Sequence, residues 1–261
     1  MRLTRALLAG AAAVALAFTS LAGVAAETDP RPLIAGGKAA TESYPFMASL
    51  QRLDGSHFCG GSLITPQWVV SAAHCVDTMS PDQIRVRVGS NDRTTGGELR
   101  SVVRVILHPQ FERYLVSSND ISLLRLDAPV SARAVEIAGS SPARGTAVRL
   151  LGWGLECPYL GCGTPPRMLK QLDTLVAAPP ACETLVVGLQ EQDLCVDNRN
   201  GSEGICFGDS GGPALQRAAG GWLLVGVASR GTYLYCGMSP MIYTDATAYR
   251  NWITQNVGTG G

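Results

Sequence analysis

Gly208-Asp209-Ser210-Gly211-Gly212-Pro213 is the stretch from which the fold and the chemistry of this chain are best approached. The serine has one glycine two residues before it and another immediately after it, and glycine permits tight turns and close approach of a substrate. Such a serine would stand on a rigid loop, with backbone N–H groups free to stabilise a developing oxyanion. Glycine-rich segments are usually plain turns, so these six residues alone leave a turn and a catalytic loop both open.

The composition is typical of an all-β exported protein with many turns. The 261 residues suffice for one large or two small domains with buried cores, and 30 of them are glycine and 15 proline. Lys plus Arg and Asp plus Glu both number 21, so the formal net charge is zero. No nucleic-acid or other polyanionic partner is therefore expected.

The N-terminus predicts an export signal over residues 1–26. Arg2 and Arg5 precede the apolar run 6–18, and the small residues 24–26 offer a cleavage site. That run is too short to cross a bilayer, which needs roughly 20 apolar residues, so no membrane partner is predicted. The polar segment 27–33, with two prolines, is either a ragged start or a removable propeptide.

The cysteine content fits secretion. Exported proteins meet oxidising conditions, so the 8 cysteines are expected to form disulfides. A zinc site is the competing use, but only Cys157 and Cys162 lie close together in the chain, and no histidine is near them. We therefore expect no metal site.

Hydrophobic patterns predict short strands in two sets of similar size, with a final helix. Ile84, Val86 and Val88 alternate with arginines, which is the period of a half-buried strand. The last helix is expected to be capped by Thr244 or Asp245. The segment rich in Ala, Ser and Pro over 127–145 is the candidate interdomain linker. The other apolar runs lie at 46–50, 58–64, 102–107, 121–126, 147–153, 171–177, 222–229 and 241–244.

Two more residues stand in distinctive local frames. His74 lies within Ser71-Ala72-Ala73-His74-Cys75, where small residues leave room around the imidazole ring. Asp120 precedes the apolar run 121–126, and a buried carboxylate is costly unless it is paired. Taken singly, the histidine would be structural and the aspartate a turn or cap residue.

Together with Ser210, these residues resemble the arrangement in chymotrypsin-like (trypsin-family) secreted serine proteases. The resemblance covers the chain from Ile34 to the C-terminal helix. It rests on six motifs in family order: Ile34-Ala35-Gly36-Gly37, Cys59-Gly60-Gly61-Ser62-Leu63-Ile64, Ser71-Ala72-Ala73-His74-Cys75, Asn119-Asp120-Ile121, Gly152-Trp153-Gly154 and Gly208-Asp209-Ser210-Gly211-Gly212-Pro213.

The resemblance implies an all-β fold of two antiparallel Greek-key β-barrels, over 34–143 and 144–261, with a C-terminal α-helix. It implies a secreted, monomeric endopeptidase that needs no cofactor, acts on polypeptides and meets protein protease inhibitors. His74, Asp120 and Ser210 would be catalytic, and the N–H groups of Gly208 and Ser210 would form the oxyanion hole. The family analogy gives the disulfides Cys59–Cys75, Cys182–Cys195 and Cys206–Cys236, which leaves Cys157 and Cys162 to pair by elimination.

Two other functions fit parts of the same sequence. The motif Gly208 to Gly212 also fits the G-x-S-x-G pattern of α/β-hydrolases, in which a histidine follows the serine. No histidine occurs after His108, so that fold is rejected. A catalytically silent family member acting as a secreted binding module would lack a triad residue, and none is lacking here.

Activation is a further implication of the resemblance. A freed α-amino group at Ile34 would insert and pair with Asp209, so that the oxyanion loop becomes ordered. The residue before that cut is Leu33, where many family members carry a basic residue, and cleavage after Arg31 is blocked by Pro32. We expect the activating protease, or the enzyme itself, to prefer an apolar residue there.

Specificity is predicted from departures from the family pattern. The residue six before the nucleophile forms the base of the primary pocket, and here it is Gly204 rather than an acid. Glu203 is one residue away, which leaves trypsin-like specificity as the alternative. The other expected substrate-binding residues are Ile205, Ser229, Gly231 and Met241, and the thioether of Met241 would shorten an apolar pocket. Arg230, where many relatives have Trp, predicts a neighbouring subsite that favours an acidic substrate residue.

Overall fold

The computed structural model describes residues 37–113, 118–157, 159–183, 188–199, 201, 203–231 and 235–258. The predicted export signal, the propeptide segment and Ile34 lie outside these residues. The chain divides into a unit of residues 1–31 and a compact unit of residues 32–261, and the description below concerns the second unit.

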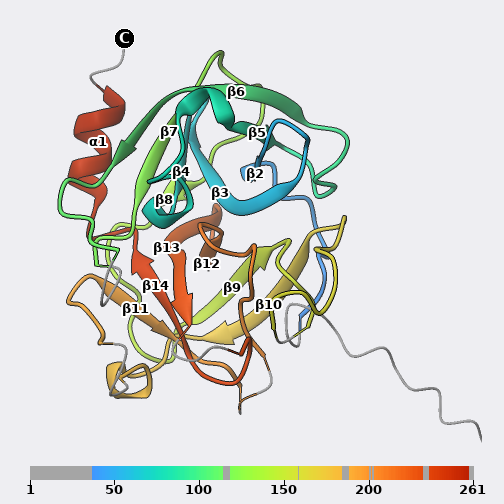
Figure 1. Ribbon diagram of the computed structural model, residues 1–261. Helices are drawn as coiled ribbons and strands as arrows, with labels where there is room; N and C mark the ends of the chain where they lie inside the picture. Colours follow the sequence, from blue (N-terminus) through green and yellow to red (C-terminus); the bar gives the residue numbers. More distant parts are fainter. Residues whose placement is uncertain are drawn as a thin grey trace, which may run out of the picture. The chain divides into compact units, whose positions relative to one another are not determined.

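Six strands of the first half form a closed antiparallel barrel (Figure 1). Alternation along one of these strands explains why they do so, because Val86 and Val88 are fully buried while Arg85 of the same strand is exposed. The strands follow the order β2-β3-β4-β7-β6-β5. Their bounds are β2 (Met47–Gln51), β3 (His57–Thr65), β4 (Trp68–Ser71), β5 (Arg85–Val88), β6 (Glu98–Leu107) and β7 (Ser122–Leu126), with short 3-10 helices η1 (Ala73–Cys75) and η2 (Pro81–Gln83).

The second half builds an eight-stranded sheet in the order β1-β10-β9-β12-β13-β14-β11, with β8 beside β13. An isolated bridge joins Val176, just after β10, to Val196 of β11, and so brings strands from opposite sides of this order together. The mostly β fold with a final helix that the sequence predicts is thus confirmed. The bounds are β1 (Lys38–Ala39), β8 (Glu136–Ile137), β9 (Ala147–Gly152), β10 (Lys170–Leu175), η3 (Pro179–Ala181), β11 (Asp193–Val196), β12 (Pro213–Ala218), β13 (Gly221–Gly231) and β14 (Met241–Asp245).

The segment predicted to be a linker is held against both halves of the fold. Val130 and Val135 are buried, and their N–H groups donate to Pro66 O and Leu63 O of the first barrel. The next residues form β8, which pairs in parallel with Leu223 and Leu224 of β13. Residues 127–145 therefore fasten the two halves together rather than separating them.

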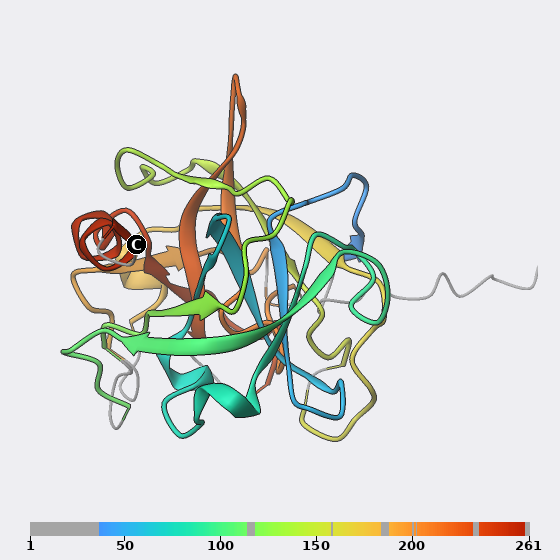
Figure 2. The same cartoon turned by 90° about the horizontal axis from the view of Figure 1, so that it is seen from above.

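The C-terminal helix α1 (Arg250–Gly258) starts later than the sequence suggests. Asp245 accepts hydrogen bonds from the N–H and hydroxyl of Thr247 at 2.9 and 2.7 Å, so it caps a turn before the helix and not the helix itself. Ile253 is buried against the barrel core, and the helix is seen end-on in Figure 2. Within the described residues, no helix is long and apolar enough to span a membrane.

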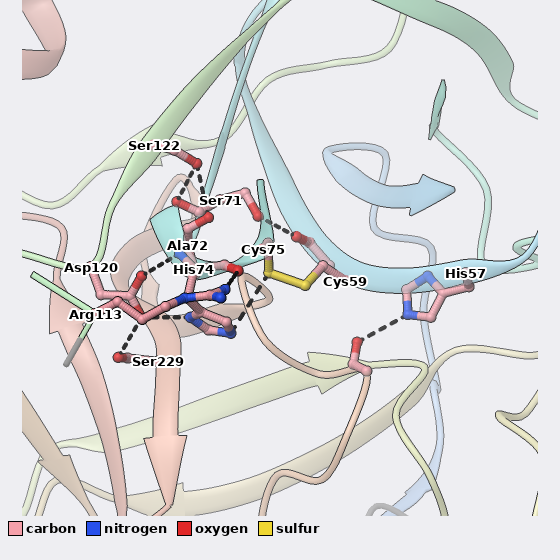
Figure 3. The surroundings of a disulfide bond; sticks show 12 residues. His57, Cys59, Ser71, Ala72, His74, Cys75, Arg113, Asp120, Ser122 and Ser229 are labelled. Atoms are coloured by element: carbon pink, nitrogen blue, oxygen red, sulfur yellow. Dashed lines mark hydrogen bonds and ion pairs between the residues drawn. A yellow bond between two sulfur atoms is a disulfide. The ribbon is translucent and has the colours of Figure 1, made fainter. Parts of the chain in front are cut away.

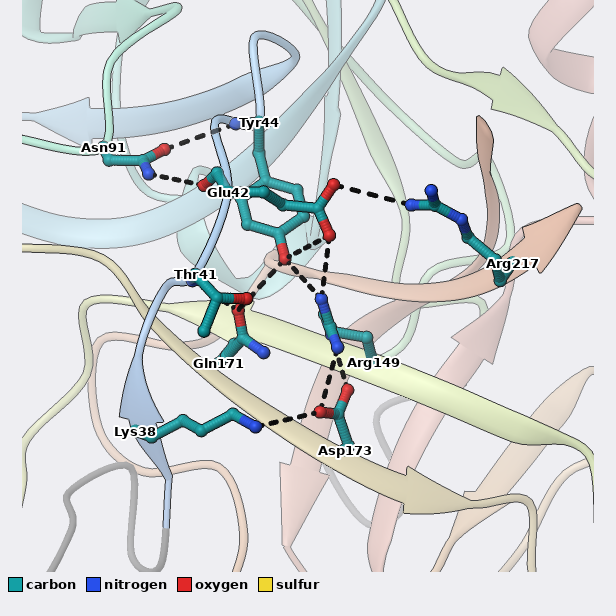
Figure 4. A network of polar contacts seen from close by, with 9 residues as sticks. All are labelled: Lys38, Thr41, Glu42, Tyr44, Asn91, Arg149, Gln171, Asp173 and Arg217. Carbon is teal, nitrogen blue, oxygen red and sulfur yellow. Dashed lines mark hydrogen bonds and ion pairs between the residues drawn. The ribbon is translucent and has the colours of Figure 1, made fainter. Parts of the chain in front are cut away.

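A polar network fastens the start of the described chain to the second sheet (Figure 4). Arg149 of β9 donates to Glu42 at 3.0 Å and to the Tyr44 hydroxyl at 2.8 Å, and it forms a close ion pair with Asp173 of β10. Lys38 of β1 approaches the same Asp173 at 3.5 Å. These contacts fix the path of the chain that follows residue 37.

Candidate active site

His74 lies in η1, directly after β4, and is held by Asp120 (Figure 3). The backbone N–H of His74 donates to Asp120 Oδ1 at 2.9 Å, and the ring Nδ1 lies 2.7 Å from Asp120 Oδ2. A carboxylate only accepts, so Nδ1 carries the proton, and Nε2 of the neutral ring is left as a base.

Asp120 is fully buried just before β7. Its Oδ2 also accepts the hydroxyl of Ser229 at 2.7 Å, and its backbone O accepts from Thr244 at 3.0 Å. Burial acts to raise the pKa of this carboxyl, but the hydrogen bonds from His74, the charge of His74 when it is protonated, and the bond from Ser229 outweigh burial and lower the pKa. Asp120 is therefore ionised at neutral pH.

Ser210 stands on a glycine loop packed against the first barrel. Gly60 N donates to Ser210 O at 2.7 Å, and Gly211, at φ 78°, would carry a Cβ only 2.2 Å from Ser71 Oγ. Only glycine fits there, which explains the residue after the serine. Ser210 and Ser229 line one pocket. Within the described part of the chain, no hydrogen bond joins Ser210 to His74.

Two N–H groups of this loop are left without an acceptor among the described residues. The N–H groups of Asp209, Gly211 and Gly212 donate to carbonyls, whereas those of Gly208 and Ser210 do not. Phe207 O accepts from Leu155 N at 2.8 Å, so the N–H of the same peptide, at Gly208, points the other way. The two groups are available to an anionic oxygen.

Asp209 is 1% exposed, and its carboxylate is enclosed by backbone. Its oxygens accept from Gly154 N at 2.7 Å and Cys206 N at 2.9 Å, and a Cβ added to Gly152 would lie 1.8 Å from Oδ1. Burial raises the pKa of Asp209 to about 6, against the effect of these hydrogen bonds. No described cation pairs with it, so the ionised form is electrostatically uncompensated.

His57 is a member of the site that the sequence analysis did not assign. Its Nε2 donates to Gly208 O at 3.0 Å, which directs Nδ1 to accept the Ser49 hydroxyl at 2.9 Å. Burial lowers the pKa of His57 to about 4, so the ring is neutral at physiological pH. The first barrel thereby holds the loop of Ser210 through a neutral histidine.

Of the five expected specificity residues, all but Gly204 line a cavity of about 170 Å³. Ile205 N approaches Met241 Sδ at 3.0 Å, and a Cβ on Gly204 would lie 2.9 Å from the same sulfur. The thioether therefore occupies the space beside Gly204, and Met241 lines the cavity. Among the described residues no carboxylate lines it; the lining residues are Ile205, Cys206, Phe207, Ser210, Ser229, Arg230, Gly231, Tyr235, Cys236, Gly237, Ser239 and Met241.

Four disulfides are present, in the same pairing that the sequence analysis gives. They join Cys59 to Cys75, Cys157 to Cys162, Cys182 to Cys195, and Cys206 to Cys236. His74 lies close to both sulfurs of the first pair, with Nε2 3.9 Å from Cys75 Sγ. Sulfurs bonded to each other are not thiolate ligands, so this group is a structural cross-link beside His74 and not a zinc site.

Comparison with known proteins agrees with this geometry. The family model described as Trypsin matches residues 33–253. Trypsin of Sarcophaga bullata is 33% identical over 248 residues, which cover 93% of this chain and 95% of that protein. Trypsin delta of Drosophila melanogaster is 32% identical over 257 residues, covering 96% and 98%. The chain belongs to the trypsin family and is a serine endopeptidase.

Proposed function

We propose that the chain is a secreted endopeptidase that cleaves after apolar residues, with Ser210 as nucleophile, His74 as general base and Asp120 as the residue that orients His74. The observation that carries the assignment is the hydrogen-bonded chain from Ser229 through Asp120 to His74, next to the pocket that Ser210 lines. The described residues show no hydrogen bond from Ser210 to His74, and such catalytic bonds often tighten only in the Michaelis complex.

The reaction proceeds through an acyl-enzyme. His74 Nε2 takes the proton of the Ser210 hydroxyl as its oxygen attacks the peptide carbonyl carbon, and then gives that proton to the leaving amine. Water then attacks the acyl carbonyl while His74 takes its proton, and His74 returns that proton to the Ser210 oxygen as the acid is released. The N–H groups of Gly208 and Ser210 stabilise the oxyanion, a contribution of roughly 100- to 1000-fold in rate for one donor.

The pocket accounts for the apolar preference. A guanidinium or ammonium group buried beside Met241 would lose its hydration without gaining a counter-ion, which is costly. Glu203, the residue that kept basic specificity open, does not line the cavity; its carboxylate lies 3.7 Å from Arg199 Nε. Small or medium apolar side chains fit the remaining space, and Ser229 and Gly231 offer backbone to an extended substrate.

Release of Ile34 activates the enzyme in this proposal. The buried Asp209 needs a cation, and a free α-amino group supplies one. Ala39 pairs with Lys170, which pairs with Gly152 beside Asp209, so two strand spacings place Ala39 about 10 Å from Gly152. The segment 34–39 can span up to about 17 Å when extended, which is long enough to deliver the amine.

The remaining assignments follow from the sequence. Residues 1–26 are the export signal, 27–33 the propeptide, 34–143 the first barrel and 144–261 the second barrel with the helix. The enzyme acts outside the cell as a monomer on polypeptides, is open to protein inhibitors and needs no cofactor.

Two measurements test the proposal. An organophosphonate should label the form that starts at Ile34 on Ser210 and should fail to label the Ser210→Ala variant. A panel of peptide substrates that differ only in the residue before the scissile bond should show higher kcat/KM for Leu than for Arg. Absence of labelling in a folded, Ile34-started protein would favour the silent binding module, and a preference for Arg would refute the pocket assignment.

A further inference from the structure

Arg230 makes contacts that its place beside the substrate pocket does not suggest. It lies in β13 directly after Ser229, and its side chain is only 12% exposed. One guanidinium nitrogen donates to Asp193 Oδ2 at 2.5 Å and to Gly188 O at 3.0 Å, and the other lies 3.3 Å from Ser229 Oγ. Asp193, in β11, is itself 3% exposed, so the ion pair is buried.

This pairing removes the reason to expect an acidic substrate residue at the neighbouring subsite. The positive charge of Arg230 is already matched by Asp193, and its donors point toward β11 and Ser229. The guanidinium is therefore unavailable as a free cation for the substrate.

The same contacts join Arg230 to the catalytic hydrogen bonds. A serine hydroxyl has one proton, and Ser229 Oγ lies close to both Arg230 Nη1 and Asp120 Oδ2. Arginine has only donors, so Ser229 accepts from Arg230 and must give its own proton to Asp120. Arg230 thus fixes the hydroxyl in the orientation that holds Asp120.

Different charged groups lie at the two ends of this series of hydrogen bonds. Asp120 and Asp193 are buried close enough that the charge of Asp120 contributes to raising the pKa of Asp193, although burial is the main cause and Arg230 opposes both. Tyr249, next to α1, lies near the two carboxylates and Asp245, because burial and then the charges of Asp193, Asp120 and Asp245 raise the pKa of its hydroxyl. On the side of His74, Arg113 donates to His74 O at 2.7 Å and pairs with Asp77.

We propose that Arg230 and Asp193 form a buried ion pair that positions Ser229 and sets the basicity of His74 through Asp120. Arg230 stands one hydrogen bond closer to Asp120 than Asp193 does, so its charge opposes protonation of His74, and Asp193 moderates that effect. Arg230 is a positioning residue and does not act on the substrate. The inference rests on the proposed roles of His74, Asp120 and Ser210 and extends them.

Opposite changes in the pH profile test this inference. The acid limb of kcat/KM reports the general base of the free enzyme. Asp193→Asn leaves the arginine charge unopposed and should move that limb to lower pH by about 0.5 unit. Arg230→Met removes the cation and should move the limb to higher pH by a similar amount. The double variant should lie between the two single variants.

Controls separate a tuning role from a packing role. Arg217→Met, which removes an arginine that is 61% exposed and paired with Glu42, should leave the limb in place. Arg230→Lys keeps the charge and should restore much of the shift seen in Arg230→Met. If both single variants lower kcat/KM without moving the limb, or move it in the same direction, the inference is overturned. Failure of the proposed triad would instead appear in the unaltered enzyme, as absent labelling of Ser210.

Discussion

Replacing Met241 by glycine is the sharpest test of the pocket. Met241 is 1% exposed, and its sulfur lies 3.0 Å from Ile205 N and 2.9 Å from where a Cβ on Gly204 would stand. The Met241→Gly variant therefore removes the thioether from the lining of a cavity of about 170 Å³ and should enlarge it on the side of Gly204.

The expected magnitude follows from the volume removed. One methylene in an apolar enzyme pocket is worth about 1–3 kcal/mol, or roughly 10- to 200-fold in specificity. Removal of a whole thioether should raise kcat/KM for Phe relative to Leu by at least about 10-fold. A buried methionine lost from a core costs about 2–5 kcal/mol of stability, so the thermal midpoint should also fall.

A carboxylate should create basic specificity only after that space exists. Gly204→Asp alone would force a Cβ against the Met241 sulfur and bury a charge without room for its partner. We expect it to leave the ratio of Arg to Leu cleavage low, whereas the double variant with Met241→Gly should favour Arg.

The assay is kcat/KM on matched peptide substrates, with organophosphonate labelling as the measure of active enzyme. Met241→Leu, which nearly conserves volume, is the matched control and should keep the preference of the unaltered enzyme. If Met241→Gly remains folded and labelled but its Phe to Leu ratio changes by less than twofold, the sulfur does not limit the pocket and the reasoning fails.

Three further outcomes are expected. Burial lowers the pKa of His57 from its ordinary 6.5 to about 4. The contribution of neutral His57 to the stability of the folded protein is therefore complete above pH 6.5 and is lost as the pH falls toward 4. Urea unfolding at several pH values should show a loss of about 2–3 kcal/mol in the free energy of unfolding. His57→Gln should flatten that part of the curve of stability against pH. Leu33→Arg should let an added protease specific for basic residues release a chain that begins at Ile34, whereas the unaltered precursor should resist it; N-terminal sequencing distinguishes the two results. Changing Cys157 and Cys162 to serine should lower stability by at most about 2–4 kcal/mol, seen as a lower thermal midpoint, without altering the substrate preference.

Strands with a half-buried pattern could be predicted from the sequence, and strands made by tertiary pairing could not. Ile84, Val86 and Val88 carry a period of two because one face of β5 is buried in the barrel. The two-residue strand β8 has no such period, since it exists only where residues 136–137 meet β13. The surrounding segment 127–145 is rich in Ala, Ser and Pro, and from sequence alone it therefore predicts a linker.

The site divides in a similar way. His74, Asp120 and Ser210 stand in local sequence frames that are distinctive in themselves, so their candidacy could be argued without coordinates. His57 could not be assigned, because its role depends on Gly208, which is 151 residues away in the chain. The pairing of Arg230 could not be predicted for the same reason, since its counter-ion Asp193 is 37 residues distant in the chain.

Family membership and specificity rest on different physical features of this chain. The strands and the hydrogen bonds around His74 and Asp120 depend on many buried residues, and a trypsin that is 33% identical to this chain matches 93% of its length. The base of the pocket depends on two side chains, Gly204 and Met241, one of which has no atoms beyond the backbone. A single carboxylate there would supply the counter-ion that a basic substrate needs, and in our proposal the sulfur of Met241 instead favours an apolar side chain. Identity at this level therefore shows the reaction, and we propose that these two positions decide the substrate.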